Sequence, residues 1–570
     1  MIFRRSQFAD SLLSSLRSSM RPSPSGDAGR NPATLLIVVS LWIAIVGNGA
    51  LWQELAKLGR LQSGADIWVA VCTGLLIWGV LVSTTVLLAW RRSIKPVLIF
   101  LAVAAALGMH FMMSYGVVID DTMMINVFQT DPRETRDLLN LRLLFTVLIV
   151  AGLPTLWLLR QRVQHTCWSK QALRNALILI AGCAVFITAI ALSFQGFSSL
   201  MRNHKHVRYL LNPLNSLYAI GQIVTKPLRH GPQPLQAIGQ DAQLGASYAA
   251  EAKPPVLMIV VGETARSANF SFNGYARQTT PNMTQLAQNE GFVYWKDAWS
   301  CGTNTAASLP CMFSHLGKEQ FEDSKARYES LLDVLQRAGL AVLWIDNQSG
   351  CKGVCDRVAH VSTVSAKDPA HCSSGECHDL VMLQGLNERI AQLPAQQRAK
   401  GVVVLLHQMG SHGPAYYKRV PSAFKKFQPE CTTNNLSECS REQITNSYDN
   451  TLLYTDQLLE SSVQWLKAQD SSARTAMIYV SDHGESLGEK GIYLHGLPYA
   501  IAPNEQKQIP WLNWLSPSMA ASRGLDMSCL RKNAAGRITH DHLFHSVLGL
   551  LDVKTSLHQR NLDVYSACQK

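Results

Sequence analysis

Five long apolar runs limit what this chain can fold into more than any other feature of its sequence. An α-helix needs roughly 20 apolar residues to cross a hydrocarbon core, and each run is close to that length. A cleaved signal peptide does not fit, because roughly 30 polar and basic residues precede the first run. We therefore expect a membrane domain of five helices in the first third of the chain. The runs span residues 33–52, 67–90, 96–115, 143–159 and 173–194.

The cations between these runs predict how the membrane domain is oriented. Basic residues precede the first run, lie between the second and third (Arg91, Arg92 and Lys95), and return between the fourth and fifth. The loop around residues 120–134 is instead acidic. By the positive-inside rule the N-terminus is cytoplasmic, so five spans carry everything after residue 194 to the opposite side. The net charge of +12 alone would also suit nucleic acid, but the apolar runs make that the poorer interpretation, and no nucleic-acid partner is expected.

The cysteines agree with an oxidising compartment for the second half, since ten of the 13 lie after residue 300. Neighbouring cysteines would pair, although the sequence does not fix the connectivity. Alternatively, Cys351, Cys355, Cys372 and Cys377 could form a structural zinc site. Pairing of neighbours would give Cys301–Cys311, Cys351–Cys355, Cys372–Cys377, Cys431–Cys439 and Cys529–Cys568.

The pattern after residue 253 alternates apolar runs with helical stretches, which predicts an α/β domain with a mostly parallel central sheet. Apolar runs at 256–261, 341–345, 402–406 and 476–480 are typical of buried strands, and helices are expected at 328–338, 380–393 and 445–469. The expected organisation is a cytoplasmic tail (1–32), a membrane domain of five spans (33–195), a linker with an interfacial segment (196–253) and a periplasmic catalytic domain (254–570).

Polar side chains follow three of the four predicted strands, where parallel sheets bind ligands. Glu263 follows the first, His412 the third, and Asp482 and His483 the fourth, with His495 a short loop later. Each alone has an ordinary structural explanation, but together the two carboxylates and His483 form a ligand set typical of zinc. His412 and His495 could bind a second metal ion, hold a phosphate or protonate a leaving group.

The stretch from Ser300 to Cys311 places Thr303 and Thr305 after a glycine and before a short apolar run, which predicts the start of a helix. Thr305 could complete the metal site and act as a nucleophile, because metal coordination lowers the pKa of a hydroxyl. Such hydroxyls also commonly cap helices.

In the loop between the third and fourth runs, Asn126, Thr130 and Glu134 recur at a spacing of four, which would place them on one helical face. A solvated face on a short interfacial helix explains that spacing equally well.

Four motifs in order resemble the membrane phosphoethanolamine transferases that act on lipid A, a family that includes the mobile colistin-resistance enzymes. The resemblance implies a catalytic domain of the alkaline phosphatase and sulfatase type. It implies that Glu263, Thr305, Asp482 and His483 hold zinc, with Thr305 as the nucleophile, and that His412 and His495 lie near the substrate phosphate or a second zinc. It also implies lipid-substrate contacts from Asn126, Thr130 and Glu134 and a basic contact from Lys352. The motifs are Val-Gly-Glu-Thr-Ala-Arg-Ser-Ala-Asn (261–269), Ser-Cys-Gly-Thr-Asn-Thr (300–305), Gly-Ser-His-Gly-Pro (410–414) and Ser-Asp-His-Gly-Glu-Ser-Leu-Gly-Glu (481–489).

The expected activity is therefore zinc-dependent transfer of phosphoethanolamine from phosphatidylethanolamine to a phosphate of lipid A, through a covalent intermediate on Thr305. The expected location is the bacterial inner membrane, and the expected consequence is less negative surface charge and resistance to polymyxin. Alternative hypotheses are transfer to Kdo, heptose or another glycan, a phosphodiesterase or sulfatase-type hydrolase, and a receptor without catalysis. The Cys-x-Pro-x-Arg motif of sulfatases is absent at the nucleophile position, which reads Thr-Asn-Thr.

Overall fold

The computed structural model describes residues 29–570 except for 131, 231–232, 251–252, 289–290 and 374–375. The chain divides into two compact units. The first comprises the described residues up to Leu107 together with Phe145–Leu200, and the second comprises Gly108–Leu144 and Met201–Lys570. The loop between the third and fourth apolar runs therefore belongs to the same compact unit as the α/β domain.

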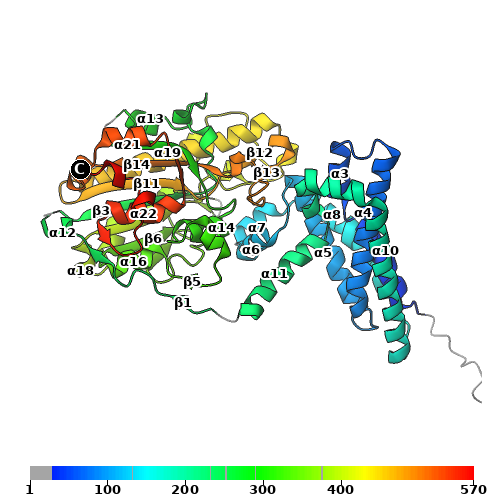
Figure 1. Ribbon diagram of the computed structural model, residues 1–570. Coiled ribbons are helices and arrows are strands. Elements are labelled where there is room, and N and C mark those ends of the chain that lie inside the picture. Colours follow the sequence, from blue (N-terminus) through cyan, green and yellow to red (C-terminus); the bar gives the residue numbers. More distant parts are fainter. Residues whose placement is uncertain (1–28, 131, 231–232, 251–252, 289–290, 374–375) are drawn as a thin grey trace, which may run out of the picture. The chain divides into compact units, whose positions relative to one another are not determined.

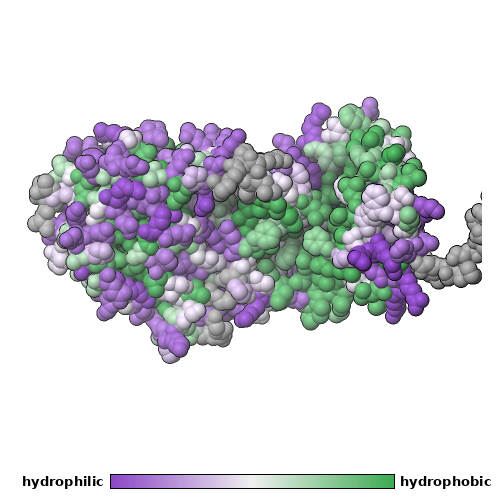
Figure 2. Space-filling model, turned by 90° about the horizontal axis from the view of Figure 1, so that it is seen from below, coloured by the Kyte–Doolittle hydropathy of each residue, from purple (hydrophilic) through white to green (hydrophobic). Residues whose placement is uncertain are grey.

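Five helices among the described residues are long and apolar enough to cross a membrane, which confirms the five predicted spans. Large apolar side chains such as Phe100 and Leu177 are more than half exposed on them, as expected of surfaces that face lipid. Figure 2 shows the hydrophobic colour gathered over these helices. The five spans are Pro32–Lys57 (α2, Pro32–Ile45, and α3, Gly49–Lys57), Gly64–Leu88 (α4, Gly64–Thr85, and η1, Val86–Leu88), Ile94–Tyr115 (α5), Leu141–Arg160 and Trp168–Asn203 (α10).

The fourth span continues through Pro154 by widening its helix locally. Helix α8 (Leu141–Val147) leads into a π-helical turn, η2 (Leu148–Gly152), and α9 (Leu153–Arg160) follows with Pro154 in its first turn. A proline ring clashes with the carbonyl four residues earlier and offers no N–H group, and a π turn is a common local accommodation of such a defect. The span predicted at 143–159 is therefore a continuous helical segment.

A sheet of eight strands forms the centre of the α/β domain, in the order β15-β4-β14-β11-β3-β10-β6-β7. The four strands predicted from the sequence are its neighbouring members β11, β3, β10 and β6, and they are mutually parallel. Strand β14 is antiparallel to both of its neighbours, so the sheet is mostly parallel, as predicted. The strands are β3 (Pro255–Gly262), β4 (Phe292–Trp299), β6 (Ala341–Asp346), β7 (Ala359–Ser362), β10 (Val402–His407), β11 (Arg474–Ser481), β14 (Gln508–Leu515) and β15 (Arg537–Thr539).

Helices cover both faces of this sheet (Figure 1), and successive residues of β3 alternate between the two cores. Leu257 and Ile259 belong to one hydrophobic cluster and Met258 and Val260 to the other, as the two-residue period of a strand requires. The first cluster includes α14 (Thr305–Met312), α16 (Leu331–Arg337) and α22 (Asp541–Leu550), and the second includes α13 (Pro281–Leu286), α17 (Leu386–Ala391) and α19 (Arg441–Gln469).

Two of the three predicted helices, α16 and α19, are confirmed with small shifts of their ends. The single helix predicted at 380–393 is wrong: it is a 3₁₀ turn, η6 (Asp379–Leu383), followed by α17. The break lies at Gly385, whose φ of 63° is left-handed and incompatible with a continuing helix.

All five predicted disulfides are present: Cys301–Cys311, Cys351–Cys355, Cys372–Cys377, Cys431–Cys439 and Cys529–Cys568. The alternative zinc site is excluded, because its four cysteines are consumed in two of these bonds. The remaining cysteines, Cys72, Cys167 and Cys183, are free.

The last part of the linker region pairs with strands of the α/β domain. After η3 (Lys205–Leu210) and α11 (Leu214–His230), strand β1 (Leu235–Gln236) pairs with β5 (Arg327–Tyr328). Strand β2 (Gln243–Leu244) then pairs with β16 (Val553–Lys554), near the end of the chain. Both short pairs lie outside the central sheet.

Candidate active site

The predicted site residues meet at the carboxyl ends of three adjacent parallel strands. Glu263 directly follows β3, Asp482 and His483 follow β11, and His412 lies in the loop after β10. Thr305 is the first residue of α14. Residues that are 219 positions apart in the sequence, Glu263 and Asp482, thus come together because their strands are neighbours.

Glu263, Asp482 and His483 form a compact, buried group whose ligand atoms all lie within 4.8 Å of one another. The Thr305 hydroxyl lies 3.2 Å from each Glu263 carboxylate oxygen and 3.5 Å from His483 Nε2. None of the four residues is more than 3% exposed. The arrangement brings together the two carboxylates, imidazole and hydroxyl that the sequence analysis grouped.

The electrostatics of this group fit a bound divalent cation. Burial and the adjacent Asp482 raise the pKa of Glu263 to about 8. Burial by itself would lower the pKa of His483, but Asp482 and Glu263 outweigh it and raise that pKa to about 9. Asp482 Oδ2 is buried and accepts no hydrogen bond from any residue that the structure describes. That oxygen lies 3.3 Å from His483 Nε2. Two buried carboxylates beside an imidazole suit a metal ion, and the donor set is one that zinc accepts.

Thr305 is not the cap of its helix. The Asn304 side chain accepts the hydrogen bond from the Ala307 amide and so caps α14. Thr303 Oγ1 donates instead to the Leu497 carbonyl at 2.6 Å. The capping explanation therefore does not apply to either threonine, and the Thr305 hydroxyl faces the acidic group. The Cys301–Cys311 disulfide ties the loop before α14 to the helix.

Two further histidines border the group. The His495 ring lies 4.3 Å from the His483 ring and 5.5 Å from the His412 ring, measured between centroids. Burial, together with the charge of His483, holds the pKa of His495 well below its usual range. Burial and the neighbouring His495 and Arg419 do the same for His412. Both imidazoles are therefore neutral at pH 7, with polar nitrogens beside the site.

Asn126, Thr130 and Glu134 do not lie on one continuous helix, so that part of the sequence prediction is wrong. Helix α6 (Asp121–Gln129) ends at Thr130, and α7 (Pro132–Leu138) begins anew. The chain leaves the helical conformation at Thr130, whose ψ of 133° is extended, and Pro132 begins α7, a position that suits proline because it needs no N–H partner there. Thr130 Oγ1 donates to the Asn126 carbonyl at 2.8 Å, and the buried Glu134 lies 4.0 Å from His412 Nε2. Glu134 thus reaches the site, and α6 contacts α14.

Lys352 lies in the loop that the Cys351–Cys355 disulfide closes, and its φ of 49° is left-handed. Its ammonium donates to Ser349 Oγ at 2.9 Å and reaches the carbonyl of Gln129, at the end of α6, at 3.4 Å. The predicted basic contact is therefore next to the segment that holds Asn126.

Sequence reasoning missed two buried residues at this site. Gln348 Nε2 donates to Glu263 Oε2 at 3.3 Å, and nothing in the local sequence signals that contact. Glu485 is fully buried, 3.4 Å from His495 Nδ1, and burial raises its pKa well above the usual range. Its position two residues after His483, in the same motif, was a usable signal.

Arg419 is a third missed residue, and it connects three elements. Its guanidinium donates to the His412 carbonyl at 2.9 Å, to Asp137 Oδ2 at 2.9 Å and to Glu376 Oε2 at 2.7 Å. Both the Arg419 and the Asp137 side chains are buried. Helix α7 is thereby fixed to the loop that presents His412.

The fold and the site define a member of the alkaline phosphatase and sulfatase type of α/β enzyme, and a family model described as Sulfatase matches residues 255–553. A second model, described as Phosphoethanolamine transferase EptA/EptB, matches residues 77–228. The chain belongs to the phosphoethanolamine transferase family, as two curated relatives and a solved structure also show.

Phosphoethanolamine transferase EptA of Escherichia coli strain K12 is 37% identical over 94% of this chain and 96% of the relative. Phosphatidylethanolamine transferase Mcr-1 of Escherichia coli is 35% identical over 92% of this chain and 95% of the relative. The integral membrane lipooligosaccharide phosphoethanolamine transferase A of Neisseria meningitidis superposes with a TM-score of 0.88 at 32% identity, covering 94% of this chain and 99% of that one.

Membership in this family makes the protein a phosphoethanolamine transferase of the inner membrane, with its catalytic domain in the periplasm. The five apolar helices and the five disulfides of the α/β domain agree with that location.

Proposed function

We propose that this enzyme transfers phosphoethanolamine from phosphatidylethanolamine to a phosphate of lipid A, through a covalent intermediate on Thr305 and with zinc as its metal. One observation carries the proposal. Thr305 is the first residue of a helix, and its hydroxyl lies 3.2 Å from both carboxylate oxygens of Glu263. Glu263 is buried and belongs to the group of three residues that could hold a metal ion. Helix N-termini favour anions, so the substrate phosphate also has a natural position there.

In the first half of the reaction, Thr305 Oγ forms a bond to the donor phosphorus and the bond from phosphorus to the diacylglycerol oxygen breaks. The Glu263 oxygens are the nearest acceptors for the hydroxyl proton. His412 and His495 are the candidates for protonating the departing diacylglycerol oxygen: both are neutral before the reaction, and negative charge developing on that oxygen would raise the pKa of either imidazole, which could then pass a proton from solvent to it. Zinc held by Glu263, Thr305, Asp482 and His483 would lower the pKa of the hydroxyl and offset charge on the phosphoryl group.

In the second half, an oxygen of a lipid A phosphate attacks the same phosphorus and the bond to Thr305 Oγ breaks, which restores the hydroxyl. The product carries an added ammonium group on its phosphate. The outer surface becomes less negative, and cationic polymyxin should bind it less well. The names of two relatives support the two substrates. One relative is a phosphatidylethanolamine transferase, and the solved structure is of a lipooligosaccharide enzyme.

Mass spectrometry of lipid A from cells that express the wild type, Thr305→Ala or Thr305→Ser tests the proposal. We expect an added phosphoethanolamine mass with the wild type, none with Thr305→Ala, and partial modification with Thr305→Ser, which keeps a hydroxyl. Purified Thr305→Ala should still contain zinc by elemental analysis, because three ligands remain.

Three outcomes would contradict parts of the proposal. Modification of Kdo, heptose or another glycan, with lipid A unchanged, would show that this glycan is the acceptor and lipid A is not. Continuous release of diacylglycerol, well beyond one equivalent per enzyme and without any modified acceptor, would make the protein a hydrolase. Transfer at the wild-type rate by Thr305→Ala would show that no covalent intermediate forms on Thr305.

A further inference from the structure

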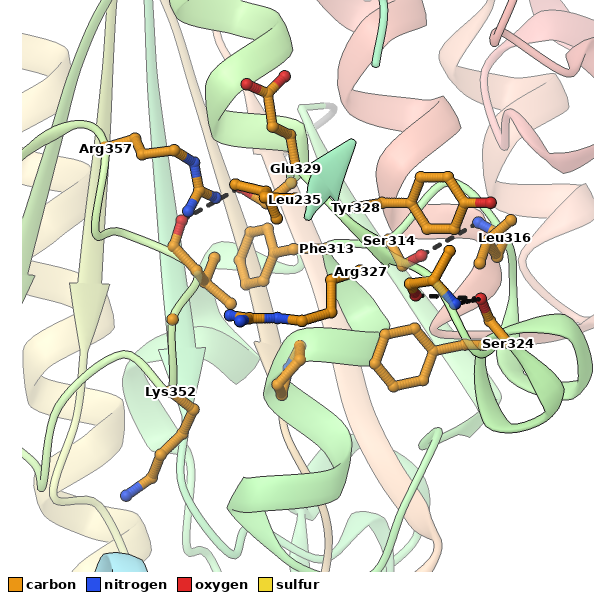
Figure 3. Close-up of a pocket in the computed structure, with 16 residues that line it drawn as sticks. Leu235, Phe313, Ser314, Leu316, Ser324, Arg327, Tyr328, Glu329, Lys352 and Arg357 are labelled. Carbon is orange, nitrogen blue, oxygen red and sulfur yellow. Dashed lines mark hydrogen bonds between the residues drawn. The ribbon is translucent and has the colours of Figure 1, made fainter. Parts of the chain in front are cut away.

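A cavity of about 260 Å³ lies in the α/β domain beside the second half of α14 (Figure 3). Its walls are largely apolar and include Leu235, Phe313, Phe321 and Tyr328. Phe313 is fully buried, whereas Leu235 is 39% exposed, so the cavity has a packed interior and an open rim. None of the residues assigned to the reaction above lines it except Lys352.

The cavity also carries an uncompensated positive charge. Two of its other charged residues are neutralised locally, because Arg357 is paired with Asp333 at 2.6 Å and Glu329 with Arg337 at 2.7 Å. Arg327 is exposed, and its side chain has no hydrogen-bond or ion-pair partner among the residues that the structure describes. Figure 3 shows its guanidinium reaching beneath Phe313 toward the loop of Lys352. Five donors in a fixed fork suit an oxyanion such as a phosphate.

Two elements connect this cavity to the nucleophile. Helix α14 carries Thr305 at its start. Pro310, in the last turn of this helix, and Phe313, just past its end, line the cavity. With a rise of 1.5 Å per residue, these positions lie about 8 to 12 Å from Thr305 along the helix axis. Lys352 provides the second connection, since it lines the cavity while its ammonium contacts Ser349 and the end of α6.

We propose that this cavity is a subsite for the acceptor, in which Arg327 binds a second phosphate of lipid A while the phosphate to be modified lies at Thr305. The proposal rests on the proposed function. Lipid A is an acylated disaccharide with a phosphate at each end, so it offers an anion and hydrocarbon at a distance from the reacting group. The donor does not fit the cavity in this way. Its single phosphate must lie at Thr305, and its ammonium would be repelled by Arg327.

Kinetics of the full-length enzyme with two acceptors test the subsite. Wild type and Arg327→Glu are compared with bis-phosphorylated lipid A and with monophosphoryl lipid A, using phosphatidylethanolamine vesicles as donor. We expect Arg327→Glu to raise the KM for the bis-phosphorylated acceptor about tenfold, the value of one charge-assisted hydrogen bond. The KM for the monophosphoryl acceptor should change less than about twofold, because its single phosphate lies at Thr305 and leaves no second phosphate for Arg327 to bind.

Two further measurements separate this role from others. The burst of diacylglycerol released in the absence of acceptor reports the donor half of the reaction alone and should be unchanged in Arg327→Glu. The matched control is Arg560→Glu, an exposed arginine outside the cavity, which should leave every parameter at the wild-type value.

An unchanged KM in Arg327→Glu, or an equal rise with both acceptors, would overturn the subsite while leaving the proposed function intact. If Arg327→Glu lowers the diacylglycerol burst by the same factor as the transfer rate, the cavity binds the donor, and the acceptor subsite is overturned as well. If the wild type modifies neither acceptor, the proposed function itself fails, and the acceptor subsite fails with it.

Discussion

Asp346 shows how a single buried carboxylate can order the loop beside the candidate metal site. It ends β6, and its Oδ2 accepts hydrogen bonds from His407 Nδ1 and Trp344 Nε1, each at 2.9 Å. Its Oδ1 accepts the amides of Gln348 and Gly350 at 3.0 and 3.1 Å. Gln348 contacts Glu263, so Asp346 supports the candidate metal site through Gln348.

Asp346→Asn should destabilise the protein by about 2 kcal/mol at pH 7. Burial by itself raises the pKa of Asp346, but His407 and the hydrogen bonds outweigh it and lower the pKa from 3.8 to about 2. The unfolded state therefore binds the proton more tightly than the folded state. The stabilisation is complete above about pH 4 and is lost as the pH falls toward 2.

Thermal unfolding of full-length wild type and Asp346→Asn in detergent, followed by near-ultraviolet circular dichroism across this pH range, measures the effect. The exposed Asp323→Asn is the control and should match the wild type. A difference in Tm between wild type and Asp346→Asn that stays constant from pH 7 to pH 3 would contradict the assignment.

Residues that follow buried strands could be predicted from the sequence, and residues defined by remote partners could not. Glu263 and Asp482 were found because apolar runs mark the strands and parallel strands share one carboxyl edge. The hydrogen bond between Asp346 and His407 joins positions 61 residues apart, and no local sequence pattern predicts it. Arg419 is likewise defined by Asp137, 282 residues earlier in the chain.

At the scale of elements, the short helices α6 and α7 lie beside the candidate active site. Helix α6 contacts α14, the helix that begins with Thr305, and α7 is held by Asp137, which pairs with Arg419 at 2.9 Å and with Lys418 at 2.6 Å. The segment that brings Glu134 to His412 is thus anchored by a buried ion pair.

Asp137→Asn should lower kcat/KM for transfer roughly tenfold or more, because breaking a buried ion pair leaves Arg419 less well compensated and loosens the support of His412. Asp137→Glu should recover part of the loss, since it restores the charge. Initial rates with phosphatidylethanolamine vesicles and lipid A measure both variants, again with Asp323→Asn as the control. Wild-type rates in Asp137→Asn would show that the anchor does not matter for catalysis.

The two wrong helix predictions have one physical cause. Periodicity and spacing extend a helix for as long as the pattern continues, but a single residue can end it. Pro132 separates Thr130 from Glu134, and Gly385 divides the helix expected at 380–393. The strand predictions were more reliable than the helix predictions, because in an α/β domain a fully apolar run of five or six residues is rarely anything other than a buried strand.

For the whole molecule, the division into units assigns Gly108–Leu144 to the same unit as the α/β domain. A fragment of residues 235–570 retains the whole central sheet and all five disulfides. It lacks Glu134 and Asp137, together with every membrane span. The fragment should therefore fold and bind zinc but perform transfer poorly.

We expect fragment 235–570 to show native-like circular dichroism and no free thiols, and to transfer phosphoethanolamine from vesicles to lipid A roughly 100-fold more slowly than the full chain. Supplying both substrates in mixed micelles separates membrane tethering from the missing residues, because micelles remove the need for a tether. Recovery of the full rate in micelles would show that α6 and α7 contribute nothing to the chemistry.

The disulfides have a consequence for how the chain is made. Each cysteine of the α/β domain is bonded to the next one along the chain, with separations of 10, 4, 5, 8 and 39 residues. Export delivers the polypeptide from its N-terminal side, so partners emerge consecutively. An oxidase that joins thiols in order of arrival produces the native set directly, without reshuffling by an isomerase. Biogenesis of this enzyme should depend on oxidising capacity in the periplasm and be indifferent to the loss of disulfide isomerisation.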